Sequence, residues 1–311
     1  MRTTVGLSFF ITMKYDKRPI DISQQLQLLQ QRGLRILDID EAVKILNSIS
    51  YFRLASYWQT FEEHGIESHQ FIQGCCFDEV VELYLFDKKL RGLIFSAIQD
   101  IEIALRTRII HCFSLRYGAF WFMDSALFKN ETIFNNCLDN INKEVKRSNE
   151  IFLKEHFEKY DEPSLPPVWK TMEVVSFGTL SKLFCNFKDV EVKKLVAKSF
   201  GLPQYAYLES WMKSISALRN CCAHHGRLWN KRLPFIPQLP TRLPLSWISL
   251  KPRQQFKLYA PICCMAYLEQ SIKPKSTFTK EIVSLLSNLP TSALKHMGVP
   301  LEWEKETLWR L

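Results

Sequence analysis

The chain has 311 residues, of which 47% are hydrophobic and 13% aromatic, so it can bury a sizeable core and is not an intrinsically disordered protein. Its formal net charge is +9, and the basic residues are spread along the chain, which favours contact with nucleic acid first and an anionic membrane surface second. Nine cysteines without a C-x-x-C pair argue against a secreted disulfide framework and favour reduced thiols in the cytoplasm.

The first residues, "MRTTVGLSFFIT", form a short apolar run without a small-residue cleavage site. We therefore expect residues 1–14 either to be poorly ordered or to precede the true start at Met13. No other apolar stretch approaches the roughly 20 residues of a membrane span, and no contact with the membrane is expected. Glycine is scarce and Leu, Ile, Lys, Glu and Gln recur at helical spacing, which predicts an all-α fold built as a helical bundle.

Residues 15–75 are expected to form a small helical N-terminal unit. The stretch "DISQQLQLLQQRGL" predicts a helix that begins at Asp21 or Ser23 and ends at the following glycine. The stretch "DIDEAVKILNSIS" predicts a second helix, capped by Asp38 or Asp40. The aromatic "YFRLASYWQTF" comes next, and aromatic residues at helical spacing are more often core than contacts for bases.

Residues 76–272 are expected to form the main helical core. Only Gly92 interrupts the helical pattern between Asp78 and about Arg116, which predicts one long helix that can bend near Gly92. The proline-rich segment 161–167 is a predicted loop. Further helices are expected around residues 169–177, 180–187, 188–200 and 204–230.

The five prolines between Pro234 and Pro252 predict an extended connector, and another helix is expected to begin at Pro252. Residues 273–311 are expected to form a short helical or irregular C-terminal extension.

The stretch "SALRNCCAHHGRLWN" places several polar groups in one predicted helix. Each helical residue advances about 100°, so Ser216, Arg219, Asn220, His224 and Arg227 are expected to line one stripe. The neighbouring histidine falls on the apolar side and is expected to be a hydrogen-bonded core or interface residue.

An arginine and a neutral histidine on one polar stripe suit phosphodiester chemistry. The guanidinium of Arg219 can hold a phosphate through two hydrogen bonds, and the imidazole of His224 can exchange a proton near neutral pH. In RNA the 2′-hydroxyl can be the nucleophile, so this chemistry requires no metal and no cofactor. A zinc cluster of Cys221, Cys222 and the two histidines is disfavoured, because the four side chains spread around the predicted helix.

Two other polar pairs lie in "DIEIALRTRIIH", on the long helix. Glu102 and Arg106 are four residues apart and are expected to form an intrahelical ion pair, or else to lie at the edge of the same phosphate site. Arg106 and His111 repeat the arginine-to-histidine spacing. An arginine followed by a histidine at this spacing is expected about 0.4 times by chance in such a chain, so the spacing alone is weak.

The pattern R-N-x-x-A-H-H-x-R-L-W-N, from Arg219 to Asn230, resembles the signature of the Abi-like abortive-infection family of the AbiD/AbiF type, whose core belongs to the HEPN superfamily of helical ribonucleases and toxins. The resemblance extends from about Lys17 to Asn230. "ISYFRLASYW" is similar to the N-terminal element of the family, "DIEIALRTRI" to its spine-helix motif and "WKTMEVVSFGTLSKLF" to the segment before the signature. The departures, Ser50 in place of Gly and Ala55 in place of Ser, concern packing more than chemistry.

This resemblance implies a HEPN-like core and metal-independent RNA cleavage. The superfamily motif R-x(4–6)-H corresponds to Arg219 and His224, with His225 also at an allowed spacing, and Asn220 matches the polar residue that follows the arginine. The superfamily usually combines two such motifs, which implies a homodimer. If Arg106 and His111 supplied the second half, a monomer would suffice.

Three functions are consistent with these sequence features. The first is a phage-defence endoribonuclease in which Arg219 binds the scissile phosphate, His224 transfers a proton, Asn220 orients both, and Arg227 helps to hold RNA. The second is a non-catalytic RNA-binding module, and either protein could be held in check by an antitoxin RNA or protein. The third is purely structural, with His224 and the arginines satisfying buried carboxylates such as Glu102.

Overall fold

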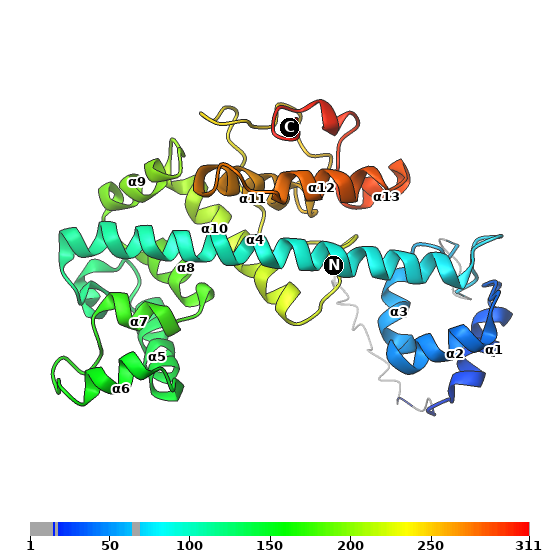
Figure 1. Ribbon diagram of the computed structural model, residues 1–311, viewed down its shortest axis with the longest axis horizontal. Coiled ribbons are helices and arrows are strands. Elements are labelled where there is room, and N and C mark those ends of the chain that lie inside the picture. Colours follow the sequence, from blue (N-terminus) through cyan, green and yellow to red (C-terminus); the bar gives the residue numbers. More distant parts are fainter. Residues whose placement is uncertain (1–14, 16–17, 64–68, 311) are drawn as a thin grey trace, which may run out of the picture. The chain divides into compact units, whose positions relative to one another are not determined.

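The computed structural model describes Tyr15, residues 18–63 and residues 69–310; the predictions for residues 1–14 concern a segment outside this range. The described residues form thirteen α-helices and three short 3-10 turns, without a strand (Figure 1). The predicted all-α fold is therefore confirmed. The chain divides into two compact units, residues 1–85 and residues 86–311, which are described separately below.

The first unit contains three short helices, α1 (Ile22–Gln31), α2 (Ile39–Ser48) and α3 (Tyr51–Trp58). Asp21 caps α1 through a hydrogen bond from the backbone N–H of Gln24, and Asp38 caps α2 in the same way. Both predicted caps are confirmed, because a carboxylate satisfies a free N–H group of the first turn. The aromatic side chains of α3 differ in exposure, because Tyr57 and Trp58 are buried whereas Phe52 is exposed.

The long helix α4 (Phe77–Tyr117) is continuous, as the sequence predicts. Its part from residue 86 onward belongs to the second unit, together with α5 to α13. Those helices are α5 (Glu131–Arg147), α6 (Ile151–Phe157), α7 (Val168–Val174), α8 (Phe177–Asn186), α9 (Val190–Ser199), α10 (Tyr205–Ala223), α11 (Tyr259–Ile272), α12 (Phe278–Ser287) and α13 (Thr291–His296). None of the helices in the described part of the chain is long and apolar enough to cross a membrane.

Helix α10 carries most of the signature and packs against α8, α9 and α11. Its buried face includes Leu208, Trp211 and Leu218, none of which is exposed. The indole of Trp211 stacks on Trp247 of the connector and donates a hydrogen bond of 2.7 Å to the carbonyl of Gln238. The connector is therefore held against α10 at Trp211.

Helix α11 begins at Tyr259, seven residues later than the sequence predicts. Part of the backbone before it is bound to other segments of the chain. The N–H of Leu233 donates to the carbonyl of Phe256, and the N–H of Arg253 donates to the carbonyl of Gly298. These pairings use groups near the predicted start of the helix, so the regular helix begins only after them.

The imidazole of His156 in α6 links the stability of the second unit to pH. It is buried, and its Nε2 atom has no hydrogen-bond partner among the described residues. Burial lowers the pKa of His156, and the charge of Lys170 lowers it further. Because the unfolded chain takes up this proton near pH 6.5 and the folded protein does so only at lower pH, stability is lost as pH falls through about 6.5.

When the pH is lowered from about 7.5 to about 5.5, the melting temperature of the His156→Phe variant is therefore expected to fall by less than that of wild type. Thermal unfolding followed by circular dichroism at both pH values would measure the two losses. Equal losses would contradict a buried neutral His156.

Candidate functional site

The signature lies where α10 ends and the chain reverses. The N–H of His225 donates to the carbonyl of Cys222 at 3.0 Å, and the N–H of Gly226 donates to the carbonyl of Cys221 at 2.7 Å. These two bonds form a Schellman motif, in which His224 is the C-cap. His225 takes the left-handed position with φ of 54°, which usually belongs to glycine and costs another residue about 1–2 kcal/mol.

Gly226 makes this reversal possible. A Cβ atom at this position would lie 2.8 Å from the sulfur of Cys221 and 3.2 Å from its carbonyl oxygen. The prediction of a helix extending to about Asn230 is therefore wrong, since α10 ends at Ala223. The residues after Ala223 keep the polar and apolar spacing of a helix, although the backbone has already turned there.

The early end of α10 divides the predicted site residues into two groups. Arg219, Asn220 and His224 remain on the last turns, where Arg219 is half-buried and the other two are exposed. Within the described ranges, none of these three side chains forms a hydrogen bond or an ion pair. They are available to a ligand.

Arg227 and His225 belong to the second group. Arg227 lies beyond the helix, so the prediction that it continues the polar stripe is wrong. His225 is exposed instead of lying in the core. Both are engaged by another group of the chain, which distinguishes them from His224.

A buried carboxylate holds the segment that follows the two histidines. Asp87 of α4 is fully buried and accepts hydrogen bonds from the N–H groups of Leu228, at 3.2 Å, and Trp229, at 2.7 Å. The guanidinium of Arg91, also buried, forms an ion pair with the same carboxylate. Trp229 is 2% exposed, so this tryptophan belongs to the core and is not accessible to a base.

Asp87 and Arg91 were not predicted from the sequence. A signal was present, because Asp87 stands at helical spacing from Leu83, Leu90 and Ile94, on the apolar side of α4. A charged residue on that face, with an opposite charge four residues later, indicates a buried ion pair whose remaining hydrogen bonds are made with another segment of the chain.

A depression of about 320 Å³ adjoins His224, between α10 and the start of the connector. It is lined by Ala217, Asn220, Cys221, His224, Gly226, Lys231, Leu233 and Pro234. A second depression, of about 360 Å³, shares Pro234 and continues along the same side of α10. It includes Lys213 and the half-exposed aromatic ring of Phe235. The two depressions meet at Pro234 and are together called the groove below.

Positive charge gathers beside this groove. Burial lowers the pKa of Lys257, and the nearby guanidinium groups of Arg227 and Arg232 lower it further. The ammonium of Lys257 is held by the side-chain oxygen of Asn230 at 2.6 Å. Arg227, Arg232 and Lys257 therefore form a cluster of cations around the end of the signature.

The neighbouring thiols differ from the histidine in their chemistry. Burial raises the pKa of Cys222 to about 12, so this thiol is not ionised at neutral pH and is not a nucleophile. All nine cysteines are free. In the described part of the chain, no group of three or more His, Cys, Asp or Glu side chains is arranged to hold a metal ion.

The predicted ion pair of Glu102 and Arg106 is confirmed, with 2.8 Å between Arg106 Nη2 and Glu102 Oε1. The same nitrogen donates to the carbonyl of Val175 at 3.0 Å. Three residues later, Gly178 of α8 faces α10, because a Cβ there would lie 3.5 Å from Ser216 Oγ. The segment 175–178 thus contacts the Arg106 region and the helix that carries Arg219. Glu102 is paired within α4, and the structural hypothesis in which His224 satisfies it is not supported.

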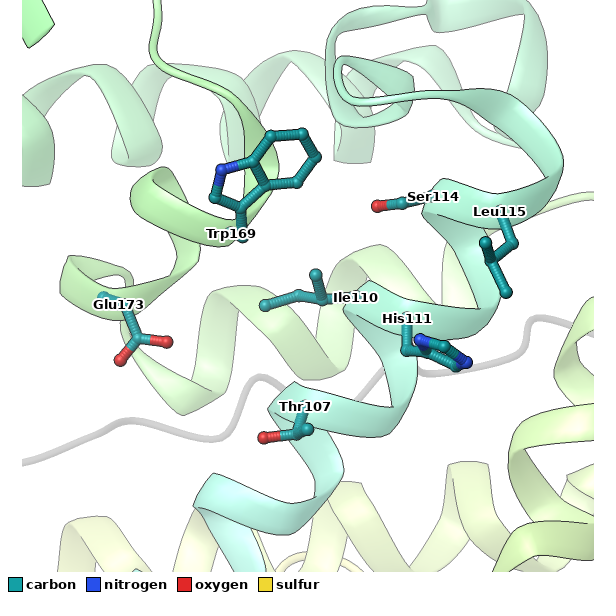
Figure 2. Close-up of a pocket in the computed structure, with 7 residues that line it drawn as sticks. All are labelled: Thr107, Ile110, His111, Ser114, Leu115, Trp169 and Glu173. Atoms are coloured by element: carbon teal, nitrogen blue, oxygen red, sulfur yellow. The ribbon is translucent and has the colours of Figure 1, made fainter.

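His111 lies apart from Arg106. It lines a pocket of about 350 Å³ between α4 and α7, and Arg106 is not among the residues that line it (Figure 2). Arg106 is instead paired with Glu102. The second motif formed by Arg106 and His111 stays a prediction.

The fold and this site define an all-helical protein with an accessible Arg, Asn and His group at a helix end, beside a basic groove. The model of the Abi-like protein family matches residues 44–230, more than half of the chain, so the chain belongs to this family. The match begins later than Lys17 and ends with the signature, at Asn230. Membership supports a role in abortive infection, a form of phage defence. Comparisons with curated proteins and with solved structures found no match.

Proposed function

We propose that this protein is a metal-independent endoribonuclease of the HEPN type, which cleaves RNA in the cytoplasm during phage defence. The observation that carries the proposal is the state of the three side chains at the end of α10. Arg219, Asn220 and His224 have no partner within the described residues, whereas the neighbouring His225 and Arg227 are engaged. Cations and polar groups left unpaired beside a groove are suited to an anionic ligand.

In the proposed reaction, the guanidinium of Arg219 holds the scissile phosphate and stabilises the charge that develops on its oxygens. The neutral imidazole of His224 accepts the proton of the 2′-hydroxyl as the 2′-oxygen attacks phosphorus. The bond to the 5′-oxygen breaks, and this oxygen receives a proton as it leaves. The products are a 2′,3′-cyclic phosphate and a 5′-hydroxyl, and Asn220 orients the two reacting side chains.

We further propose that two copies act together. One chain presents one Arg219 and His224 group, and a homodimer would supply a second imidazole to protonate the leaving oxygen. The groove along α10 is the proposed path of the RNA, with Lys213 and Lys231 near the phosphates and Phe235 available for stacking. An antitoxin RNA or protein that covers this groove would keep the enzyme inactive.

The test is the incubation of purified protein with labelled total RNA in excess EDTA. Wild type is expected to cleave, and Arg219→Ala is expected to lose about 100-fold or more of the rate, because it removes a contact to the developing charge. Arg242→Ala, at an exposed arginine of the connector, is the matched control and should retain activity.

Equal activity of Arg219→Ala and wild type would contradict the proposed site. If no protein cleaves but wild type binds RNA tightly, the same residues would serve a non-catalytic RNA-binding module. The accessible Arg, Asn and His group and the basic groove support that second function equally.

A further inference from the structure

One tryptophan of this chain differs from all the others. Seven of the eight are at most 6% exposed, whereas Trp169 in α7 is 51% exposed. It lines the pocket of about 350 Å³ between α7 and α4. An exposed aromatic plane beside a concavity is the arrangement with which proteins bind flat ligands.

The walls of this pocket are formed by side chains that recur at helical spacing on α4 and α7. Thr107, Ile110 and Ser114 lie on one stripe of α4, and Trp169 and Glu173 are four residues apart on α7. Figure 2 shows Ile110 and Ser114 reaching toward Trp169 and Glu173, while His111 and Leu115 lie on the outer side of α4. The pocket therefore has one isoleucine and two hydroxyl side chains on its α4 wall, and an aromatic ring and a carboxylate on its α7 wall.

The carboxylate of Glu173 is exposed and forms no hydrogen bond or ion pair with any residue of the described ranges. A free carboxylate offers two acceptor oxygens side by side. A ligand that matches it has two adjacent donors in the plane of an aromatic ring. Among the four RNA bases only guanine presents such an edge, with N1–H next to the 2-amino group. Adenine, cytosine and uracil each place an acceptor beside their donor.

We propose that this pocket binds a guanine base, which stacks on the indole of Trp169 and donates two hydrogen bonds to the carboxylate of Glu173. Its volume lies at the lower end of the range for small-molecule sites, about 300–1,000 Å³, which suits a nucleoside. The inference rests on the proposed function, since it makes the pocket a specificity site for the RNA substrate.

A series of contacts connects the pocket with the helix that carries the proposed catalytic residues. Its α4 wall begins at Thr107, one residue after Arg106, and the α7 helix ends one residue before Val175. The hydrogen bond from Arg106 to the carbonyl of Val175 joins these two ends. From there the segment 175–178 leads to Ser216, one turn before Arg219 in α10. These contacts join the pocket to the helix that carries Arg219, and the pocket would select one nucleotide of the bound RNA.

Binding of single nucleotides tests the pocket without any cleavage. Titration calorimetry of the wild-type protein with GMP, AMP, CMP and UMP is expected to show GMP binding at least about tenfold more tightly than the other three. Glu173→Gln should abolish this preference, because an amide offers one donor and one acceptor in place of two acceptors. Trp169→Ala should weaken GMP about tenfold or more, and Trp169→Phe should restore much of the loss.

Glu155→Gln, at an exposed glutamate of α6, is the matched control and should bind GMP like wild type. Equal affinity for the four nucleotides, or no binding of GMP, would overturn the proposal. So would an unchanged GMP affinity in Trp169→Ala combined with loss of a dimer, which would assign this face to a protein contact. Cleavage without a preference for guanine would contradict the proposed guanine site but not the proposed ribonuclease activity. Guanine binding without cleavage would support the guanine site and contradict the ribonuclease activity.

Discussion

The His224→Ala variant is expected to lose RNA cleavage by about 100-fold to 10,000-fold, the usual contribution of a positioned general base or acid. The melting temperature should stay close to that of wild type, because the imidazole is exposed and has no partner among the described residues. Initial rates on a labelled RNA in excess EDTA, together with a thermal melt of each preparation, would measure both quantities. A catalytic role requires the rate to fall while stability stays unchanged.

His225→Asn is the sharpest control for this experiment. Asparagine tolerates the left-handed conformation at this position, so the Schellman motif is expected to remain intact. The variant should keep most of its activity if His224 alone transfers the proton. If His225→Asn were inactive and His224→Ala active, the two histidines would have to exchange their proposed roles.

The Asp87→Asn variant is expected to lose about 3–5 kcal/mol of stability, the cost of breaking a buried ion pair from one side. Its carboxylate is fully buried, pairs with the buried Arg91 and accepts the N–H groups of Leu228 and Trp229. An amide has nearly the same shape but neither the negative charge nor the second acceptor oxygen. Urea denaturation followed by tryptophan fluorescence would measure the difference.

Asp139→Asn makes the same chemical change at an exposed position of α5 and should stay within about 0.5 kcal/mol of wild type. An Asp87→Asn variant as stable as this control would show that the loop after the histidines does not depend on α4. The double variant Asp87→Asn with Arg91→Met should be less destabilised than the sum of the two single changes, because the two side chains are in contact.

These two predictions assign different tasks to residues that are close in the fold. His224 is exposed and is expected to matter for rate, whereas Asp87 is buried and is expected to matter for stability. Asp87 also acts on the site indirectly, because it fixes the backbone just after the two histidines. A chain in which that backbone is loose would present His224 less precisely to a phosphate, and small displacements of a catalytic group are costly.

Much of the fold could be predicted from local sequence. Asp21 and Asp38 were each one of two predicted caps, because a short acidic side chain before an apolar periodic run is favourable at that position. The length of α4 followed from the rarity of Gly and Pro over its span. The family was indicated by the twelve residues from Arg219 to Asn230, and the match over residues 44–230 confirmed it.

The sequence by itself determined the helical class of this protein, the starts of its first helices and the polar residues of its candidate site, since these follow from side-chain chemistry and spacing along one segment. Only the tertiary structure decided where α10 ends. Just after the left-handed turn at His225, the hydrogen bond from the N–H of Trp229 to Asp87 joins residues 142 positions apart. Hydrophobic periodicity contains no information on such a contact, so it could not show that Arg227 leaves the stripe while Arg219, Asn220 and His224 remain accessible.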